Sequence, residues 1–196
     1  MRATRRGFIG AVGLSLAGCG LGNVAPAPTE LDLGGPPPAP PAEASWRFDA
    51  IVLPAFNEAK LLGTEDVVWR LGAEGRLNRY ATYRWRVAPA TLVRQRLFER
   101  LSRHGAVLTE SINAEMPQLR VTLMQFEQLY AADGSSNQGI ITLQAVLVRN
   151  GKVLGQFLGT DSEMATANTA PAGAQALRQA TDRLLDRLMQ WLSKEL

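Results

Sequence analysis

Cysteine and histidine are nearly absent from this chain, which has one of each in 196 residues, Cys19 and His104. A single cysteine cannot form an internal disulfide. One histidine without a free cysteine does not supply the cluster of ligands that a zinc ion needs. We therefore expect no metal site, no cofactor and no thiol catalysis.

The common motifs of catalysis are absent as well. No glycine-rich phosphate loop occurs, and Ser102 near His104 lies in no nucleophile-elbow sequence. The adjacent carboxylates Glu65 and Asp66 stand at the start of a predicted strand, where neighbouring side chains point to opposite faces. These observations predict that the protein is not an enzyme.

The positive net charge of the chain comes entirely from the residues that precede Cys19. The chain has 21 basic and 18 acidic residues, but Arg2, Arg5 and Arg6 precede Cys19 and no acidic residue does. The remainder is neutral, so a nucleic-acid partner is not implied. Between residues 70 and 103, however, nine arginines stand against two acidic residues. This local excess either faces phospholipid headgroups or an acidic protein surface, or forms a solvated face around a core.

The apolar run over residues 8–16 is too short to span a bilayer. It follows Arg5 and Arg6 and ends in Leu16-Ala17-Gly18-Cys19, a lipobox in which small residues directly precede a cysteine. This order predicts a signal peptide over residues 1–18, cleavage after Gly18 and lipidation of Cys19. A lipid anchor would then hold the protein on a membrane.

Two export routes fit this leader. Residues 4–9 resemble the twin-arginine motif, in which two arginines precede an apolar pair, although Gly10 stands where that motif often has lysine. An ordinary Sec leader with two adjacent arginines fits as well. Gly20, after the lipidated cysteine, differs from the aspartate that resembles an inner-membrane retention signal. The default location is therefore the inner leaflet of the outer membrane, with the domain facing the periplasm.

Proline is concentrated between the leader and the rest of the chain. Seven of the eleven prolines lie within residues 20–45, mostly among alanine, glycine and small polar residues. Such a composition cannot bury enough apolar surface to fold. We predict a disordered tether over residues 19–45, several nanometres long when extended, and one folded domain over residues 46–196.

The domain begins with three predicted strands and a helix. Residues 48–53, 67–71 and 79–85 are short apolar or aromatic stretches separated by turn-like residues. Pro89 fits the first turn of a helix, and apolar residues at helical spacing follow it until His104-Gly105 ends the pattern.

The second half predicts three more strands and a longer helix. Residues 119–126 alternate with a change of phase near Met124, which predicts a bulge. Residues 141–147 alternate too, and Asn150-Gly151 predicts a two-residue hairpin turn before a strand over residues 153–160. A long amphipathic helix closes the chain. We predict one α+β domain, an antiparallel sheet of about six strands with two helices packed on one face.

Several stretches carry a likeness to a known family. Asp66-Val67-Val68-Trp69-Arg70 supplies an apolar pair, an aromatic residue and an arginine, and residues 79–85 lead from tyrosine and tryptophan to Pro89 and a helix. With the lipobox, the tether and the later elements, this order resembles the ABC-type transport auxiliary lipoprotein family, which contains the PqiC-type lipoproteins. Arg86-Val87 departs from the alanine and acidic residue often found there, which leaves the local surface chemistry open.

The resemblance implies a role without catalysis. Family members accompany ABC transporters that use MCE-domain proteins to move phospholipids or other hydrophobic substrates between the two membranes. The protein would be an auxiliary or docking component, with an MCE-domain protein and its permease and ATPase as partners. A homo-oligomer is compatible with that role. The alternative is a structural envelope lipoprotein that recruits a cell-wall or outer-membrane partner without handling lipid. An apolar groove between sheet and helices would favour the transport role.

Aromatic and arginine side chains are enriched in protein interfaces. On that basis the candidate partner-binding residues are Trp69, Tyr80, Arg84 and Trp85. Core positions are the alternative for Trp69 and Tyr80, because both lie on predicted strands. For Trp85, which begins the link into the first helix, a core position and a partner-binding position are equally compatible with the sequence.

Overall fold

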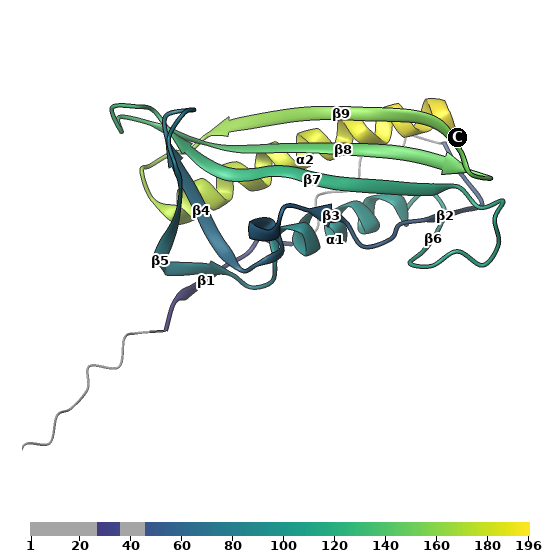
Figure 1. Cartoon of the computed structure of the whole chain (residues 1–196), viewed down its shortest axis with the longest axis horizontal. Helices are drawn as coiled ribbons and strands as arrows, with labels where there is room; N and C mark the ends of the chain where they lie inside the picture. Colours follow the sequence, from purple (N-terminus) through teal and green to yellow (C-terminus); the bar gives the residue numbers. More distant parts are fainter. Residues whose placement is uncertain (1–26, 36–45) are drawn as a thin grey trace, which may run out of the picture.

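Three long strands form one side of the sheet, with the last of the three at its edge (Figure 1). The structure, a computed structural model, describes residues 27–35 and 46–196. Strands β7 (Gln118–Tyr130), β8 (Asn137–Arg149) and β9 (Lys152–Met164) run antiparallel. Asn150 and Gly151 join β8 to β9 with φ values of 52° and 71°, which the predicted two-residue turn requires. The register shift between Leu123 and Gln125 confirms the predicted bulge.

Three short strands that precede β7 in the sequence pair with the edge of β7 that β8 leaves free. Strands β2 (Ala50–Val52), β3 (Asn57–Glu58) and β4 (Asp66–Leu71) each run parallel to β7. β2 also pairs in parallel with β6 (Ala106–Leu108), and β5 (Leu77–Trp85) returns antiparallel along β4.

The sheet is therefore mixed and has nine strands in the described part of the chain. The prediction of about six antiparallel strands is wrong in number and in pairing. Strands of two or three residues are too short to show a period-2 pattern, so β3 and β6 give no signal that sequence alone can detect.

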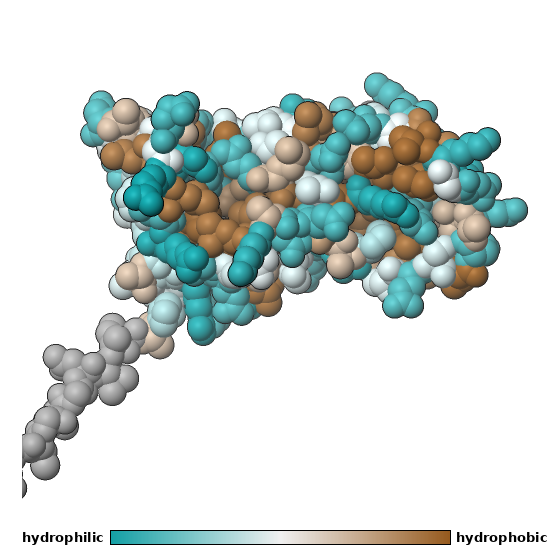
Figure 2. Space-filling model, viewed as in Figure 1, coloured by the Kyte–Doolittle hydropathy of each residue, from teal (hydrophilic) through white to brown (hydrophobic). Residues whose placement is uncertain are grey.

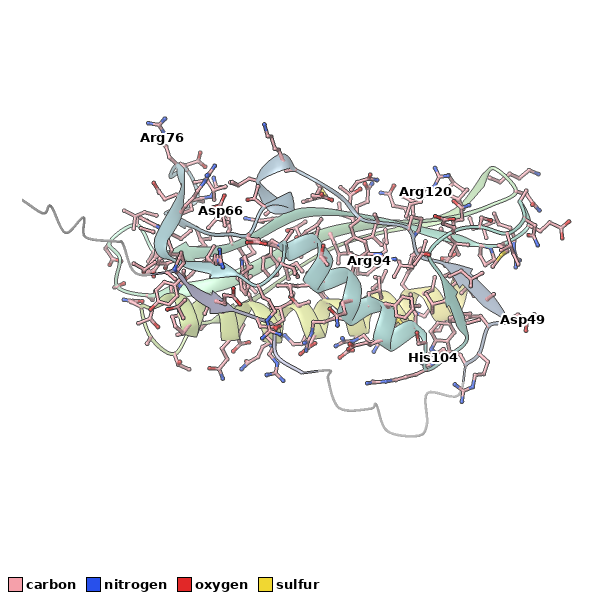
Figure 3. The ribbon with its side chains drawn as sticks, turned by 90° about the horizontal axis from the view of Figure 1, so that it is seen from below. Asp49, Asp66, Arg76, Arg94, His104 and Arg120 are labelled. Carbon is pink, nitrogen blue, oxygen red and sulfur yellow. The ribbon has the colours of Figure 1, made fainter. Side chains whose placement is uncertain are left out.

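Both α-helices lie on the same side of the sheet, as predicted (Figure 3). They are α1 (Pro89–Leu101) and α2 (Ala170–Glu195), and a short 3-10 helix, η1 (Lys60–Gly63), precedes β4. Pro89 occupies the first turn of α1, and the Thr169 side chain caps α2 by accepting the Ala172 amide at 3.3 Å. The core beneath α2 consists of fully buried aliphatic side chains: Leu119, Leu123, Ile141, Leu143, Leu147, Leu184, Leu185, Leu188 and Leu192.

Part of the predicted tether belongs to the fold. Strand β1 (Thr29–Leu31) pairs in parallel with β5 at one edge of the sheet, and Leu33, which follows it, is 1% exposed. The prediction of a disordered tether over all of residues 19–45 is therefore wrong for residues 29–35. The physical reason is that the Leu-Asp-Leu alternation there buries two apolar side chains and gains the backbone bonds of a sheet edge.

The leader lies outside the described residues. This holds for Arg5, Arg6, Leu16, Ala17 and Gly18 and for the lipidation site Cys19, which remain predictions from sequence. Within the described residues, neither α-helix combines the length and apolar character needed to cross a bilayer.

Candidate partner-binding surface

Two of the four candidate partner-binding residues meet in an aromatic cluster. Trp69 of β4 lies 6.1 Å from Tyr80 of β5 and 5.8 Å from Tyr130 at the end of β7, measured between ring centroids. Tyr83 of β5 lies 6.0 Å from Tyr80 in an edge-on arrangement. All four side chains are half-buried. The cluster therefore joins three strands and leaves only part of each ring accessible.

The Tyr80 hydroxyl is committed to the interior of the protein. It donates to the Gln128 side-chain oxygen at 2.8 Å and lies 2.7 Å from the Tyr130 hydroxyl. Burial, followed by the bond to Tyr130, raises the pKa of Tyr80 above its usual range. Because both hydrogen-bond partners of this hydroxyl belong to the protein itself, the hydroxyl contributes to the fold and is not available to bind a partner protein.

Gln128 carries this network to the start of α2. Its side-chain nitrogen donates to the Asn137 side-chain oxygen at 2.6 Å and to the Thr169 carbonyl at 3.1 Å. Asn137 in turn donates to the Ala167 carbonyl and to the Asn168 side chain. Buried polar groups must be paired inside the protein, so this chain of amides fixes the β7–β8 hairpin against the N-terminus of α2.

The other two candidates lie apart from the cluster in burial and in contacts. Arg84 is about half-exposed and pairs with Glu30 of β1 at 3.0 Å. Trp85 is 1% exposed and packs against Phe126, with 5.4 Å between ring centroids. The prediction that Trp85 contributes to a partner surface is therefore wrong, because its strand position turns the indole into the core.

The arginine-rich stretch is largely used inside the molecule. Of its nine arginines, six form ion pairs with acidic residues, and most of those acids are distant in sequence. The pairs are Arg70–Glu127, Arg79–Asp66, Arg84–Glu30, Arg86–Asp32, Arg96–Asp182 and Arg100 with both Asp182 and Asp186. Arg94 donates to the carbonyls of Leu53 and Pro54. The local charge excess seen in the sequence is thus balanced in the fold.

A buried charge cluster joins the two helices, and no sequence pattern predicts it. Arg96 and Arg100 of α1 are 3% and 4% exposed and both contact Asp182 of α2 at 2.8 Å. Asp186, one turn further along α2, contacts Arg100 at 3.1 Å and is mostly exposed. Positions 96 and 182 are 86 residues apart, so only the folded structure brings these charges together.

The sheet face away from the helices carries exposed apolar side chains. Figure 2 shows this face, with apolar atoms gathered toward the β4 side and near the hairpin that joins β8 to β9. On β9, Val153 is 65% and Leu158 is 61% exposed, and Leu154 between them is also exposed. Leu158 points away from α2, because its neighbour Phe157 packs against Trp191 of that helix.

Toward the β4 side the same face is hollowed. A depression of about 320 Å³ is lined by Leu61 and Leu62 of η1, Leu77 of β5, and Met124 and Gln125 of β7, among others. Figure 3 shows Arg120 projecting from this open side, opposite the helices. The open face of the sheet therefore has both a shallow depression and solvent-exposed apolar side chains.

A row of hydrogen-bonded polar side chains crosses the middle of this face. Arg70 of β4 holds Glu127 of β7 through two bonds of 2.9 and 3.0 Å. Gln125 donates to Glu127 at 2.7 Å and accepts from Thr142 of β8 at 3.2 Å. Thr142 also bonds Thr160 of β9 at 2.8 Å. The row ties four strands together, and its residues Arg70, Gln125, Glu127 and Thr142 also line the depression.

No apolar groove separates α2 from the sheet over the core. Leu184, Leu188 and Leu192 on α2 and Leu143 and Leu147 on β8 are all 0% exposed, so side chains fill that space. The groove that would have favoured lipid handling is thus not found at this place, and accessible apolar surface lies on the opposite side.

The histidine and the serine considered for catalysis both make structural contacts. His104 is buried, stacks on Trp46 with 4.4 Å between rings, and lies 3.0 Å from the Trp46 carbonyl through Nδ1. The Ser102 hydroxyl donates to the Phe98 carbonyl. In residues 27–35 and 46–196, no three His, Cys, Asp or Glu side chains are grouped so that they could hold a metal ion.

Comparison with known proteins places the fold but not the function. No family model and no curated protein matches the chain. Among solved structures, the chain is similar to a Xanthomonas campestris protein of the family DUF330, with a TM-score of 0.68, 20% identity, and coverage of 86% of this chain and 94% of that one. It is also similar to an uncharacterised protein, with a TM-score of 0.66, 12% identity, and coverage of 85% and 99%.

A lipoprotein from Neisseria meningitidis gives a TM-score of 0.33 at 14% identity, covering 74% of this chain and 99% of that one. That score is too low to carry an argument. The chain thus shares its fold with the Xanthomonas DUF330 protein over nearly the whole of both.

Proposed function

We propose that this protein is a lipoprotein of the bacterial envelope, anchored through Cys19 and facing the periplasm, that serves as a docking component of an MCE-type ABC transport system. The lipobox at residues 16–19 supports the anchor. The sequence likeness of residues 66–70 and 79–89 to the transport auxiliary lipoproteins supports the docking role. In this role the protein binds a partner and catalyses no reaction.

The observation that carries the docking role is the open face of the sheet. A solvent-exposed sheet face normally carries polar side chains on alternate positions, whereas β9 presents Leu158 there, and Val153 and Leu154 are exposed at the start of the same strand. Exposed apolar side chains grouped on one face mark interaction sites. We assign the docking of the MCE-domain protein to this surface, in place of the half-buried cluster around Trp69.

The alternative is a structural lipoprotein that recruits a cell-wall or outer-membrane partner. The filled space between α2 and the sheet favours it, because the domain holds no lipid-sized groove there. Both functions require the anchor and an exposed binding face. They differ in the identity of the partner.

Photocrosslinking in native membranes tests the proposal. A photoreactive residue at Leu158 should capture an MCE-domain protein, together with its permease and ATPase, identified by mass spectrometry. The same residue at Gln179, an exposed position on α2 away from the sheet, is the matched control and should capture none of them. Recovery of cell-wall enzymes or a porin alone at Leu158 would refute the transport role and favour the alternative.

The anchor has its own test. We expect Cys19→Ser to leave the domain folded, because Cys19 precedes all described elements, and to move the protein from salt-washed membranes to the soluble fraction. Persistence of the variant in washed membranes would contradict the anchor.

A further inference from the structure

The segment Thr29–Gly35, which we name the N-terminal strap, is bound to the domain along its whole length. Its first three residues pair with Tyr83, Arg84 and Trp85 of β5. The Leu31 carbonyl accepts the Arg86 amide at 2.9 Å, one position beyond the strand. The strap thus begins at the edge of the sheet and continues toward the helices.

The core and side chains of α1 and α2 hold the second half of the strap. Leu33 is buried in the core. Arg96 of α1 donates through one nitrogen, Nη1, to the carbonyls of Leu33, Gly34 and Gly35 at 3.0 to 3.1 Å. The same guanidinium is fixed by Asp182 of α2. Gly34 adopts φ +72° close to the Arg178 side chain, so the strap turns where only glycine is unstrained.

Ion pairs add to these contacts on the exposed side. Glu30 pairs with Arg84 at 3.0 Å and Asp32 pairs with Arg86 at 3.1 Å. Three kinds of interaction therefore hold the seven residues of the strap. They are backbone pairing at the sheet edge, burial of Leu33, and hydrogen bonds and ion pairs with charged side chains. A segment held in this way belongs to the domain and is not available as free tether.

We propose that the β1–β5 end of the domain lies at the membrane that holds the lipid anchor, and that the Asn150–Gly151 hairpin points away from it. This rests on the lipidation of Cys19 proposed above. Only ten Cα steps separate Cys19 from Thr29, which span at most about 35 Å. A tether free up to Trp46 would span about 95 Å. The strap therefore shortens the reach by more than half and fixes which end faces the lipid.

The orientation matters because the domain is elongated along its three long strands. In Figure 1, β1 lies at one end of the long axis, and the hairpin that joins β8 to β9 lies at the other. Strands of 13 residues such as β8 are about 43 Å long. The two ends of the domain thus lie at clearly different heights above the bilayer.

Charge does not hold the β1–β5 end on lipid, because its acids and bases are matched. Arg79 pairs with Asp66, Arg84 with Glu30, and Arg86 with Asp32. The proximity comes from the length of the tether alone. It should therefore be the same on neutral and on anionic vesicles and should persist in high salt, where surface electrostatics are screened.

Energy transfer to labelled lipid headgroups measures this orientation in the full lipidated protein. The chain has a single natural cysteine, Cys19, whose sulfur carries the lipid, so a cysteine introduced on the surface is the one reactive thiol. Donor dyes are attached to Thr82→Cys on β5 or to Lys152→Cys beside the hairpin, both exposed positions. The protein is reconstituted in phosphatidylcholine vesicles with acceptor-labelled headgroups. We expect strong transfer from position 82 and weak transfer from position 152.

Two matched insertions separate the strap from a free tether. Ten glycine and serine residues inserted between Pro28 and Thr29 lengthen the segment before the strap, and the same ten between Ala42 and Glu43 follow it. We expect the first insertion to lower transfer from position 82 and the second to leave it unchanged. Equal loss with both insertions, or equal transfer from positions 82 and 152, would overturn the proposal.

The outcomes for the anchor are distinct. If the unmodified protein does not bind vesicles after its leader is processed, both the lipidation and the orientation that rests on it are refuted. If it binds, and Cys19→Ser does not, the anchor holds and the insertions decide the role of the strap. Leu33→Asp, which removes the buried contact, should lower transfer from position 82 in the manner of the first insertion.

Discussion

The helix–helix charge cluster gives the sharpest prediction for stability. Asp182→Ala would leave Arg96 and Arg100, which are 3% and 4% exposed, without the carboxylate that both contact at 2.8 Å. Removing one partner of a buried ion pair costs about 3–5 kcal/mol, because the remaining charge is left uncompensated. The Asp182 side chain is 24% exposed, so water can replace part of the lost interaction. We therefore expect a loss of about 3 kcal/mol.

The neighbouring acid provides the control. Asp186→Ala removes the same group one helical turn away, but that side chain is 65% exposed and makes one contact, to Arg100 at 3.1 Å. Exposed ion pairs contribute about 0–1 kcal/mol. Urea unfolding of the two variants in a Cys19→Ser background, followed by circular dichroism, measures both. Thermal unfolding should show a fall in Tm of about 6–12 °C for Asp182→Ala. Equal, small losses in both variants would refute the claim that the cluster is desolvated.

Three further predictions concern the network at the start of α2 and the hairpin. Gly173→Ala should destabilise the fold by about 1–3 kcal/mol in urea unfolding, since a Cβ there would overlap the Gln128 side chain; a neutral result would mean that Gln128 moves freely. Tyr80→Phe should cost about 1–2 kcal/mol by the same assay, and Tyr83→Phe should cost less. Because the pKa of Tyr80 is raised in the folded state, stability should fall as pH rises above about 10, where the unfolded chain loses this proton first. Tyr80→Phe should flatten that fall between pH 10 and 12, and an unchanged slope would contradict the assignment. Gly151→Ala should lower Tm, because φ of 71° is strained for alanine.

The elements predicted well from sequence are those with local signals. The β8–β9 hairpin depends on Asn150 and Gly151, which adopt the positive φ values that their turn requires. The helix after Pro89 and the bulge near Met124 follow from capping preference and from a change of phase in the alternation. In each case the residues that carry the signal are the residues that make the structure.

The elements predicted poorly depend on partners far along the chain. β1 is three residues long and becomes a strand only because β5, more than 50 residues later, offers an edge. The parallel pairing of β2 and β3 with β7 has the same origin. Trp85 shows the limit for the candidate site. Its residue type favours an interface, but its burial is set by which face of β5 the core covers.

The two proposals constrain each other. A strap that keeps the β1–β5 end within about 35 Å of the bilayer places the hairpin end of β9 at the far side of the domain. Val153, Leu154 and Leu158, the exposed apolar residues of that strand, would then face the periplasm instead of the lipid of their own membrane. A protein partner that approaches across the periplasm meets this surface, whereas a lipid from the anchoring membrane must travel the length of the domain to reach it. Strong energy transfer from position 152 would therefore weaken the docking role as well as the orientation, because it would bring the apolar side chains within reach of the bilayer.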